Sequence, residues 1–236
     1  MWAVELHGIT KSFGYQQVLR GVDLRVKWGE LVAVFGPNGA GKTTLLKILA
    51  TLSRPSGGEG WVAGCHLVKE TEAIRGKIGV VAHQTFLYDE LTAEENLLFY
   101  GRMFRVANLK ERVAQVLERV GLADRAQGRV GTFSRGMQQR LSIARGLIHD
   151  PQVLLLDEPE TGLDQGSAAT LAGILREAVA EGKTVIMTTH SPERGLSLGS
   201  HVVLLAGGRV VYEEAECPPD PAVFRDLYAQ YTEARR

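Results

Sequence analysis

Residues 36–43 read Gly-Pro-Asn-Gly-Ala-Gly-Lys-Thr, which matches the phosphate-binding pattern G-x-x-x-x-G-K-T. Glycines at this spacing let successive backbone N–H groups turn toward an anion, because side chains there would block its approach. Lys42 can then reach the outer phosphates of a nucleotide, and the Thr43 hydroxyl can ligate Mg²⁺. The alternative is an ordinary glycine-rich turn before a helix. The residues expected to contact a nucleotide here are Gly36, Pro37, Asn38, Gly39, Ala40, Gly41, Lys42, Thr43 and Thr44.

The segments on either side of this loop give it the context that phosphate binding needs. Residues 31–35 form an apolar run with the length and branching of a buried strand. Residues 44–50 have the composition of a helix, so the order is strand, glycine-rich loop, helix. The N-terminus of that helix adds partial positive charge beside the loop. The pattern therefore predicts that the chain binds a nucleotide, but it does not indicate what the protein does with that nucleotide.

Two acids follow a second apolar run. Asp157 and Glu158 come directly after residues 153–156, which are all apolar. Open α/β sheets bind their ligands at the carboxyl ends of such strands. We predict that Asp157 holds or orients Mg²⁺ and its waters, and that Glu158 orients and deprotonates an attacking water.

Two more polar residues follow predicted strands. His190 comes after the strand at 184–189, and is expected near the same phosphates, where it contacts the γ-phosphate or holds Glu158 in register. Gln84 follows the strand at 78–82 and is a candidate Mg²⁺ ligand through its amide oxygen.

A second anion site is predicted where a helix begins after Phe133. Ser134 is a good N-cap, and Arg135 and Gly136 follow it at the exposed helix end, where partial positive charge gathers. One apolar face of this helix is expected to hold Met137, Leu141, Ala144 and Ile148. Two phosphate-binding helix ends in one chain suggest that two copies share a nucleotide across a dimer.

The remaining strands predict two kinds of sheet. Residues 2–9 and 21–26 alternate in polarity, which favours a half-exposed antiparallel sheet, with a turn-rich link over 11–19 between them. Further strands are expected at 60–63, 78–82, 153–158, 184–189, 201–205 and 209–212. The alternation of strands and helices after residue 150 implies a mostly parallel sheet.

From Leu91 onward, the apolar residues recur at the spacing expected of α-helices. Thr92 and Glu95 form a capping box, and Gly121 closes a later helix. Helices are expected up to Phe104, over 109–120, after Phe133, over 166–181 and over 221–236. We predict one domain, in which a helical lobe at about 85–150 is inserted into a core formed by 1–84 and 151–216.

Composition excludes several classes of protein. The 236 residues are 44% hydrophobic and 23% charged, which is ordinary for a globular domain. Basic and acidic residues balance at 27 each, so we expect no nucleic-acid partner held by bulk charge. No apolar run approaches the roughly 18 residues of a membrane helix, and the N-terminus lacks a signal-peptide pattern. Cys65 and Cys217 are far apart in the sequence, which favours a reducing cytosol.

In this order, the motifs resemble those of ATP-binding-cassette (ABC) ATPases, over about residues 3–215. Residues 36–43 resemble the Walker A loop of that family, Gln84 its Q-loop, and residues 133–137 its signature motif. Residues 153–157 resemble Walker B and Glu158 the catalytic acid. Residues 161–164, which end in Asp164, resemble the D-loop, and His190 resembles the switch histidine. Phe13 matches the aromatic side chain that stacks on adenine, with Tyr15 as the alternative.

The signature motif departs from the usual L-S-G-G-Q of the family. It reads Phe-Ser-Arg-Gly-Met, so Arg135 replaces a glycine and Met137 a glutamine, while Ser134 and Gly136 remain. Our hypothesis is that Arg135 adds a charge-assisted contact to the nucleotide of a partner copy. The alternative is that its side chain points into solvent.

The resemblance implies a P-loop NTPase with a RecA-like mixed sheet, an N-terminal antiparallel β subdomain and an inserted helical subdomain. It also implies ATP and Mg²⁺ as cofactors, and a head-to-tail dimer or paired cassette with two ATPs at the interface. Such a protein would lie on the cytoplasmic face of the cell membrane and bind a membrane permease. The side chains expected to contact the permease, or to lie in the core, are Phe86, Leu87, Tyr88 and Leu91.

The subfamily rests on fewer residues. The run from Phe133 to Pro151, with the segment 156–164, resembles bacterial haem-exporter ATPases of cytochrome c maturation. The alternative is the ATPase subunit of another exporter, with a drug, lipid or polysaccharide as cargo. A further alternative is a non-transport cassette protein that acts on ribosomes or in DNA repair.

Overall fold

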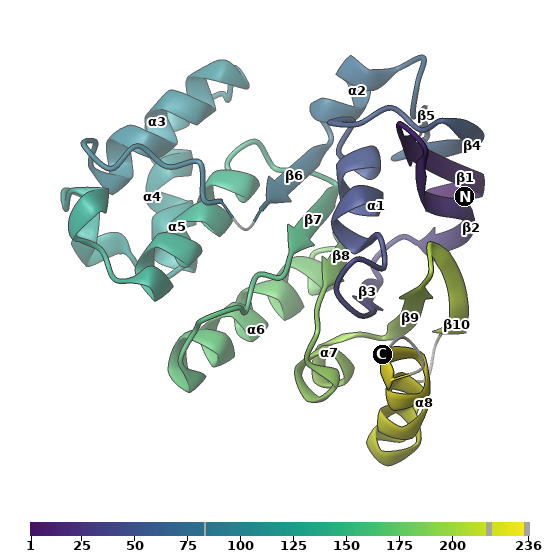
Figure 1. Cartoon of the computed structure of the whole chain (residues 1–236). Helices are drawn as coiled ribbons and strands as arrows, with labels where there is room; N and C mark the ends of the chain where they lie inside the picture. The colour runs from purple at the N-terminus through teal and green to yellow at the C-terminus, as the bar shows by residue number, and fades with distance from the viewer. Residues whose placement is uncertain (83, 216–218, 234–236) are drawn as a thin grey trace.

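A computed structural model describes residues 1–82, 84–215 and 219–233 (Figure 1). Its central feature is a six-stranded sheet with the order β10-β9-β3-β8-β7-β6, in which all neighbours are parallel except β9 and β10. The strands are β3 (Leu31–Phe35), β6 (Ile78–Val81), β7 (Val153–Asp157), β8 (Thr184–Thr188), β9 (His201–Ala206) and β10 (Arg209–Ala215). The predicted mostly parallel sheet is confirmed.

A second, antiparallel sheet has the order β2-β1-β4-β5. Its strands are β1 (Trp2–Phe13), β2 (Gln16–Lys27), β4 (Gly57–Val62) and β5 (Cys65–His66). The prediction of a turn-rich link over 11–19 was wrong, because β1 and β2 stay paired up to Phe13 and Gln16, and the turn between them has two residues. Register shifts along this pair disturb the alternation by which a strand is recognised.

Eight α-helices are present in the described part of the chain. They are α1 (Lys42–Leu49), α2 (Thr71–Arg75), α3 (Ala93–Met103), α4 (Leu109–Arg119), α5 (Arg135–Leu147), α6 (Gln165–Ala180), α7 (Pro192–Leu198) and α8 (Pro221–Glu233), with 3₁₀ turns at Ala123–Arg125 and Val130–Thr132. The sequence did not predict α2 or α7, which are short. The last three residues of the helix predicted at 221–236 lie outside the described residues.

Helices α3, α4 and α5 gather at one side of the molecule, where α5 packs against β6 at the edge of the six-stranded sheet (Figure 1). The capping box that begins α3 is present, since the Glu95 N–H donates to Thr92 Oγ1 at 3.1 Å and the Thr92 N–H donates to Glu95 Oε2 at 2.8 Å. Gly121 follows α4 with a positive φ of 63°, as a C-terminal stop requires. Ser134 caps α5, since its side chain accepts from the Met137 N–H. These three predictions are confirmed.

The core has three parts, and two of them support the edge of the sheet where β3 and β7 end. Helix α1 packs between the two sheets through residues such as Leu45 and Ile48, while helices α3 to α6 share a second cluster with Leu156. The third cluster surrounds Phe35, the last residue of β3, with Leu196 of α7 and Phe224 of α8. Among the described helices, none is long and apolar enough to cross a membrane.

Candidate active site

The phosphate loop runs from the end of β3 to the beginning of α1. A Cβ atom at Gly36 would come within 2.2 Å of the Leu205 carbonyl oxygen, so only glycine lets β3 turn into the loop beside β9. Helix α1 then begins at Lys42, whose side chain reaches back to the loop. The pocket over the loop measures about 250 Å³, and its lining residues are Gln16, Val18, Asn38, Gly39, Ala40, Gly41, Lys42, Thr43, Thr44 and Glu158.

Lys42 lies inside the loop with only 6% of its side chain exposed. Its Nζ atom donates to the Gly36 carbonyl oxygen at 2.7 Å and to the Pro37 carbonyl oxygen at 3.4 Å. Burial lowers the pKa of Lys42 below its ordinary value, although the charges of Glu158 and Asp157 act in the opposite direction. A bound phosphate would add negative charge at this point and so favour the ammonium form.

Asp157 and Thr43 form an oxygen-rich pair at the end of β7. The Thr43 hydroxyl donates to Asp157 Oδ1 at 3.1 Å, and the Thr188 hydroxyl donates to the same oxygen at 2.7 Å. Hydroxyl and carboxylate oxygens are the ligands that Mg²⁺ prefers, so this donor set fits the ion. Thr188, on the neighbouring strand β8, pairs with Asp157 in register and thereby fixes its carboxylate.

Glu158 has a left-handed backbone, with φ of 49°. This conformation is unusual for a residue with a side chain and is found at functional sites. It is held by the Glu158 N–H, which donates to Thr188 Oγ1 at 3.0 Å. The carboxylate lies between two nitrogens, with Oε1 3.7 Å from Lys42 Nζ and Oε2 3.4 Å from His190 Nδ1. The structure therefore brings the predicted base, the loop lysine and the predicted histidine together.

A buried acid connects the loop after β7 with the segment that carries His190. Glu160 is 4% exposed, and its Oε1 atom accepts a hydrogen bond from the Thr189 hydroxyl. The Thr189 hydroxyl in turn accepts from the Ser191 N–H at 3.0 Å. Arg194 of α7 donates to the Glu160 carbonyl oxygen at 3.3 Å. These hydrogen bonds fix Thr189 and Ser191, the two residues on either side of His190.

Gln84 lies in a second pocket, of about 420 Å³, and not over the phosphate loop. The residues that line it are Gln84, Thr85, Arg135, Gln138, Gln139, Glu158 and Thr161. Glu158 lines both pockets, so it marks the place where they meet. The role of Gln84 as an Mg²⁺ ligand stays a prediction.

The signature residues begin α5, and none of residues 134–137, which are all described, lines the pocket over the phosphate loop. Ser134 caps the helix by accepting from the Met137 N–H at 3.3 Å, while the Met137 side chain packs against the core. Asp164 likewise caps α6, since its Oδ1 atom accepts from the Ser167 N–H at 2.7 Å. That hydrogen bond lowers the pKa of Asp164.

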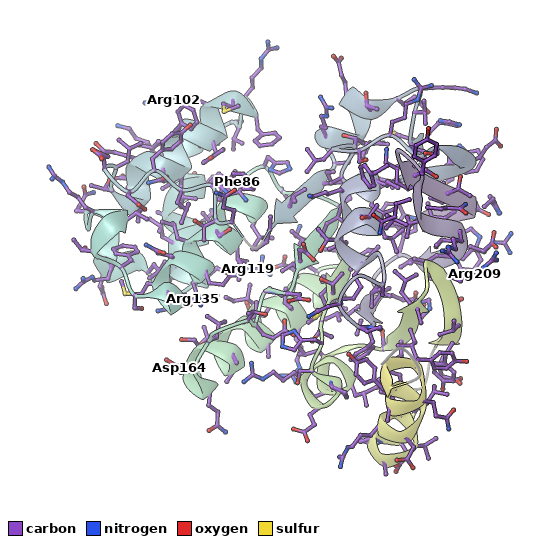
Figure 2. All side chains as sticks on the ribbon, viewed as in Figure 1. Phe86, Arg102, Arg119, Arg135, Asp164 and Arg209 are labelled. Carbon is purple, nitrogen blue, oxygen red and sulfur yellow. The ribbon has the colours of Figure 1, made fainter. Side chains whose placement is uncertain are left out.

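Arg135 does not simply point into solvent. Its guanidinium lies over Gly162 of the same chain, so closely that a Cβ atom at Gly162 would come within 2.6 Å of Arg135 Cζ. Arg135 and Asp164 lie near each other, at the adjacent ends of α5 and α6 (Figure 2). The contact joins the signature segment to the loop that follows Glu158.

The two aromatic candidates for adenine differ in position. Phe13 ends β1, its ring is 55% exposed, and the Lys11 ammonium lies 4.8 Å from the ring centroid. Tyr15 lies in the two-residue turn and is fully exposed. The cross-strand partner of Phe13 is Gln16, which lines the pocket over the phosphate loop. The geometry favours Phe13, and its stacking on adenine stays a prediction.

Sequence reasoning missed three residues of this site. No sequence pattern singles out Thr188 or Glu160, because a buried threonine or an acid after a strand is common in any α/β protein. The Tyr228 hydroxyl donates to the Gly36 carbonyl oxygen at 3.4 Å, although α8 lies 192 residues further along the chain. Only the folded chain places these groups together.

Comparison with known proteins identifies the family to which this chain is similar. A family model described as "ABC transporter" matches residues 19–161. The chain is 39% identical over 202 residues to the ABC transporter ATP-binding protein NatA of Bacillus subtilis, which covers 84% of this chain and 82% of that protein.

Two further relatives carry more specific names. The daunorubicin resistance ATP-binding protein DrrA3 of Streptomyces coeruleorubidus is 39% identical, over 89% of this chain and 67% of its own length. The Nod factor export ATP-binding protein I of Rhizobium sp. (strain N33) is 40% identical, over 89% of this chain and 70% of its own length.

The fold has solved counterparts. A dimeric ATP-binding cassette in a post-hydrolysis state, bound to ADP and Pi, superposes with a TM-score of 0.81 at 30% identity. The match covers 90% of this chain and 98% of that one. This confirms the predicted P-loop NTPase fold with its antiparallel β subdomain and helical part. The chain therefore belongs to the ABC transporter family, as an ATP-binding subunit that hydrolyses ATP.

Proposed function

We propose that this ATPase powers an exporter whose cargo is a drug, lipid or polysaccharide. The relatives named for daunorubicin resistance and Nod factor export support this choice. None of the three relatives described above is named as a haem exporter, so haem export, which the sequence favoured, has no support from them. The observation that carries the chemistry is the convergence of Lys42, Glu158 and His190 at the carboxyl edge of the parallel sheet.

The nucleotide would bind with its phosphates over the loop at residues 36–43 and its adenine against Phe13. The Lys42 ammonium has three N–H donors, so it would reach the outer phosphates from its place beside the Gly36 and Pro37 carbonyls. Thr43, Asp157 and Gln84 supply the oxygens that would hold Mg²⁺. When bound, that ion neutralises the charge that develops on the phosphates during transfer.

In this reaction, Glu158 acts as the base. A water attacks the γ-phosphorus while its proton moves to the Glu158 carboxylate, and the bond to the ADP oxygen breaks. His190, 3.4 Å from that carboxylate, keeps Glu158 in register. Thr188 is hydrogen-bonded to both the Glu158 backbone and the Asp157 side chain, so it fixes the position of the base relative to the ion site.

A second copy would complete the site. Ser134 and Gly136 do not line the pocket over their own phosphate loop, so their anion-binding helix end is available to another chain's nucleotide. We assign this contact to Ser134 and Gly136 rather than to Arg135, because the guanidinium would first have to leave Gly162. The dimeric cassette that superposes on this chain supports such pairing.

A membrane subunit would dock on the exposed aromatic side chains beside α3. Phe86 is 53% exposed and Tyr88 is 48% exposed, and the ring centroids of Tyr88 and Phe99 lie 5.2 Å apart. Phe86 lies between the helical part and β6 (Figure 2). An exposed apolar cluster of this kind is typical of an interaction surface. It would place the protein at the membrane, on the side where ATP is found.

Purification from membranes of the native host tests the assignment. We expect the intact protein to copurify with a membrane permease, and we expect daunorubicin, but not haem, to raise ATP hydrolysis in proteoliposomes of that complex. The double variant Phe86→Ala/Tyr88→Ala should lose the permease, whereas Trp28→Ala, which removes an exposed aromatic elsewhere, should retain it. Stimulation by haem alone would restore the haem-export alternative, and recovery with ribosomes would favour a non-transport role.

A further inference from the structure

Helices α6 and α7 border a cavity of about 220 Å³. Among the described residues, it shares no lining side chain with either pocket of the active site. Ala168, Leu171 and Ala172 line it from one face of α6, because residues three and four apart on a helix are neighbours. Met187 of β8, which is fully buried, and Leu198 of α7 also line it. The walls of this cavity are therefore mostly apolar.

Two arginines hold the segments around this cavity. Arg176 of α6 donates to the Ser197 carbonyl oxygen of α7 at 3.4 Å. Arg194 of α7 donates to the Glu160 carbonyl oxygen at 3.3 Å. Between these contacts, α6 presents alanines, whose short side chains leave the space open. The cavity is thus set by the packing of α7 against its neighbours.

A buried carboxylate lines the cavity as well. Glu160 is only 4% exposed, and its Oε1 atom accepts from the Thr189 hydroxyl. Its Oε2 atom is buried and has no hydrogen-bond donor among the described residues. Arg194 reaches the backbone carbonyl of Glu160 and not this oxygen. Within the described part of the chain, the carboxylate is therefore hydrogen-bonded to one neutral hydroxyl alone.

A carboxylate in this state favours a cationic ligand. A buried charged group without enough partners is costly, and a charged donor is the strongest hydrogen-bond partner it can gain. The alanine and leucine side chains favour an apolar body beside that charge. Size is also compatible, because an apolar cavity of about 150 Å³ holds benzene, so the space here admits one ring with a short arm.

We propose that this cavity binds a small organic cation, a primary ammonium on a compact apolar body, whose N–H groups donate to Glu160 Oε2. The apolar body would pack against Ala168, Leu171, Ala172 and Met187. This site is separate from the nucleotide site, and the inference does not depend on the identity of the exported cargo.

Calorimetric titration of the full wild-type chain with benzylammonium tests the site. We expect saturable binding of one ligand per chain, with a Kd of about 1 mM or below. Benzyl alcohol has the same shape without the charge, so it should bind about fivefold or more weakly. Lack of saturable binding up to about 10 mM, or equal affinity for the two ligands, would overturn the proposal.

The role of the carboxylate is tested by Glu160→Gln, which keeps the shape of the side chain. Benzylammonium should bind about tenfold or more weakly to this variant, as for the loss of a charged hydrogen bond, whereas the affinity for benzyl alcohol should stay within about twofold. Glu193→Gln, at an exposed acid of α7, should leave both affinities unchanged. An equal loss for both ligands in Glu160→Gln, or no loss for either, would contradict the assignment.

The place of binding is tested by filling the cavity. Ala172→Leu puts a larger apolar side chain into the space and should abolish binding of both ligands. Ala180→Leu makes the same change at the exposed last residue of α6 and should retain wild-type binding. Binding of benzylammonium to Ala172→Leu at wild-type affinity would place the ligand elsewhere, for example at the acids of the active site. This comparison and the wild-type titration remain decisive even if Glu160→Gln does not fold.

Discussion

The Oε2 atom of Glu158 lies 3.4 Å from the Nδ1 atom of His190. The two residues follow neighbouring parallel strands, β7 and β8, so the sheet itself sets their separation. On the other side of the carboxylate, Lys42 Nζ lies 3.7 Å from Oε1. The carboxylate is therefore oriented before any substrate arrives, which is what a base for a positioned water needs.

Replacement of His190 by alanine should slow hydrolysis without loss of nucleotide binding. Without its neighbour, Glu158 would be free to rotate, and misplacement of a catalytic group by about 1 Å can lower the rate by about 10²-fold. We expect kcat to fall by about that factor, with nucleotide affinity within about twofold of wild type. Glu193→Gln, an exposed change on the same segment, should have wild-type kcat. Near-normal turnover in His190→Ala would show that Glu158 does not need the histidine.

Two threonines on β8 offer a matched pair of variants. Thr188 and Thr184 are both buried, and both hydroxyls are hydrogen-bonded, but only Thr188 contacts Asp157 and Glu158. Each change to valine should lower the free energy of unfolding by about 1–3 kcal/mol, because buried partners lose a hydrogen bond. Only Thr188→Val should also lower kcat, by about tenfold or more. Equal kcat values in the two variants would mean that the Thr188 contacts serve stability alone. Urea unfolding and steady-state hydrolysis provide the two measurements.

His201 should make stability depend on pH. Burial acts to lower its pKa, but hydrogen bonds to Glu213, at 2.9 Å from Nε2, and Glu30, at 3.2 Å from Nδ1, outweigh burial and raise the pKa above its ordinary value. A raised folded pKa means that protonated His201 stabilises the fold fully below the unfolded pKa of about 6.5. This contribution is lost as the pH rises through the folded pKa.

Urea unfolding between about pH 5 and pH 8 measures this effect. Stability of the wild type should fall toward the alkaline side, and His201→Gln should lack that step. His7→Gln, at an exposed histidine that also lies 3.2 Å from a glutamate, should keep the wild-type profile. A wild-type profile in His201→Gln would assign the pH dependence to other groups.

Arg135→Gly distinguishes a contact within one chain from a contact between chains. Because the guanidinium lies over Gly162 of its own chain, we expect ATP-dependent dimer formation to change by no more than about twofold. A charge-assisted hydrogen bond to a partner's phosphate would be worth more than about tenfold. A loss of that size, measured by analytical ultracentrifugation, would show that Arg135 reaches across the interface.

The predictable parts of the fold are those with a local signal. The capping box of Thr92 and Glu95, the helix cap at Ser134 and the loop at residues 36–43 depend on side chains and backbone within a few residues, so their sequence pattern is sufficient. The turn between β1 and β2 was misplaced because bulges disturb the alternation. Short helices such as α7 have too few residues for a period to show.

The site was predictable only where its groups follow a recognisable strand. Asp157, Glu158 and His190 each come directly after an apolar run, and parallel strands end at one edge. Thr188 and Tyr228 act through contacts across 31 and 192 residues of sequence, to Asp157 and Gly36 respectively. Neither residue has a type or spacing that marks it, and packing alone decides what they touch.

The most direct test of the account is the behaviour of Glu158→Gln with ATP. Glutamine keeps the shape of the side chain and removes the base, so we expect nucleotide binding at wild-type affinity and kcat lower by about 10²- to 10⁴-fold. The ATP that is not hydrolysed should hold two copies together, and the variant should sediment as a dimer with ATP and as a monomer with ADP. Turnover near the wild-type rate, or a variant that stays monomeric with ATP bound, would contradict the account.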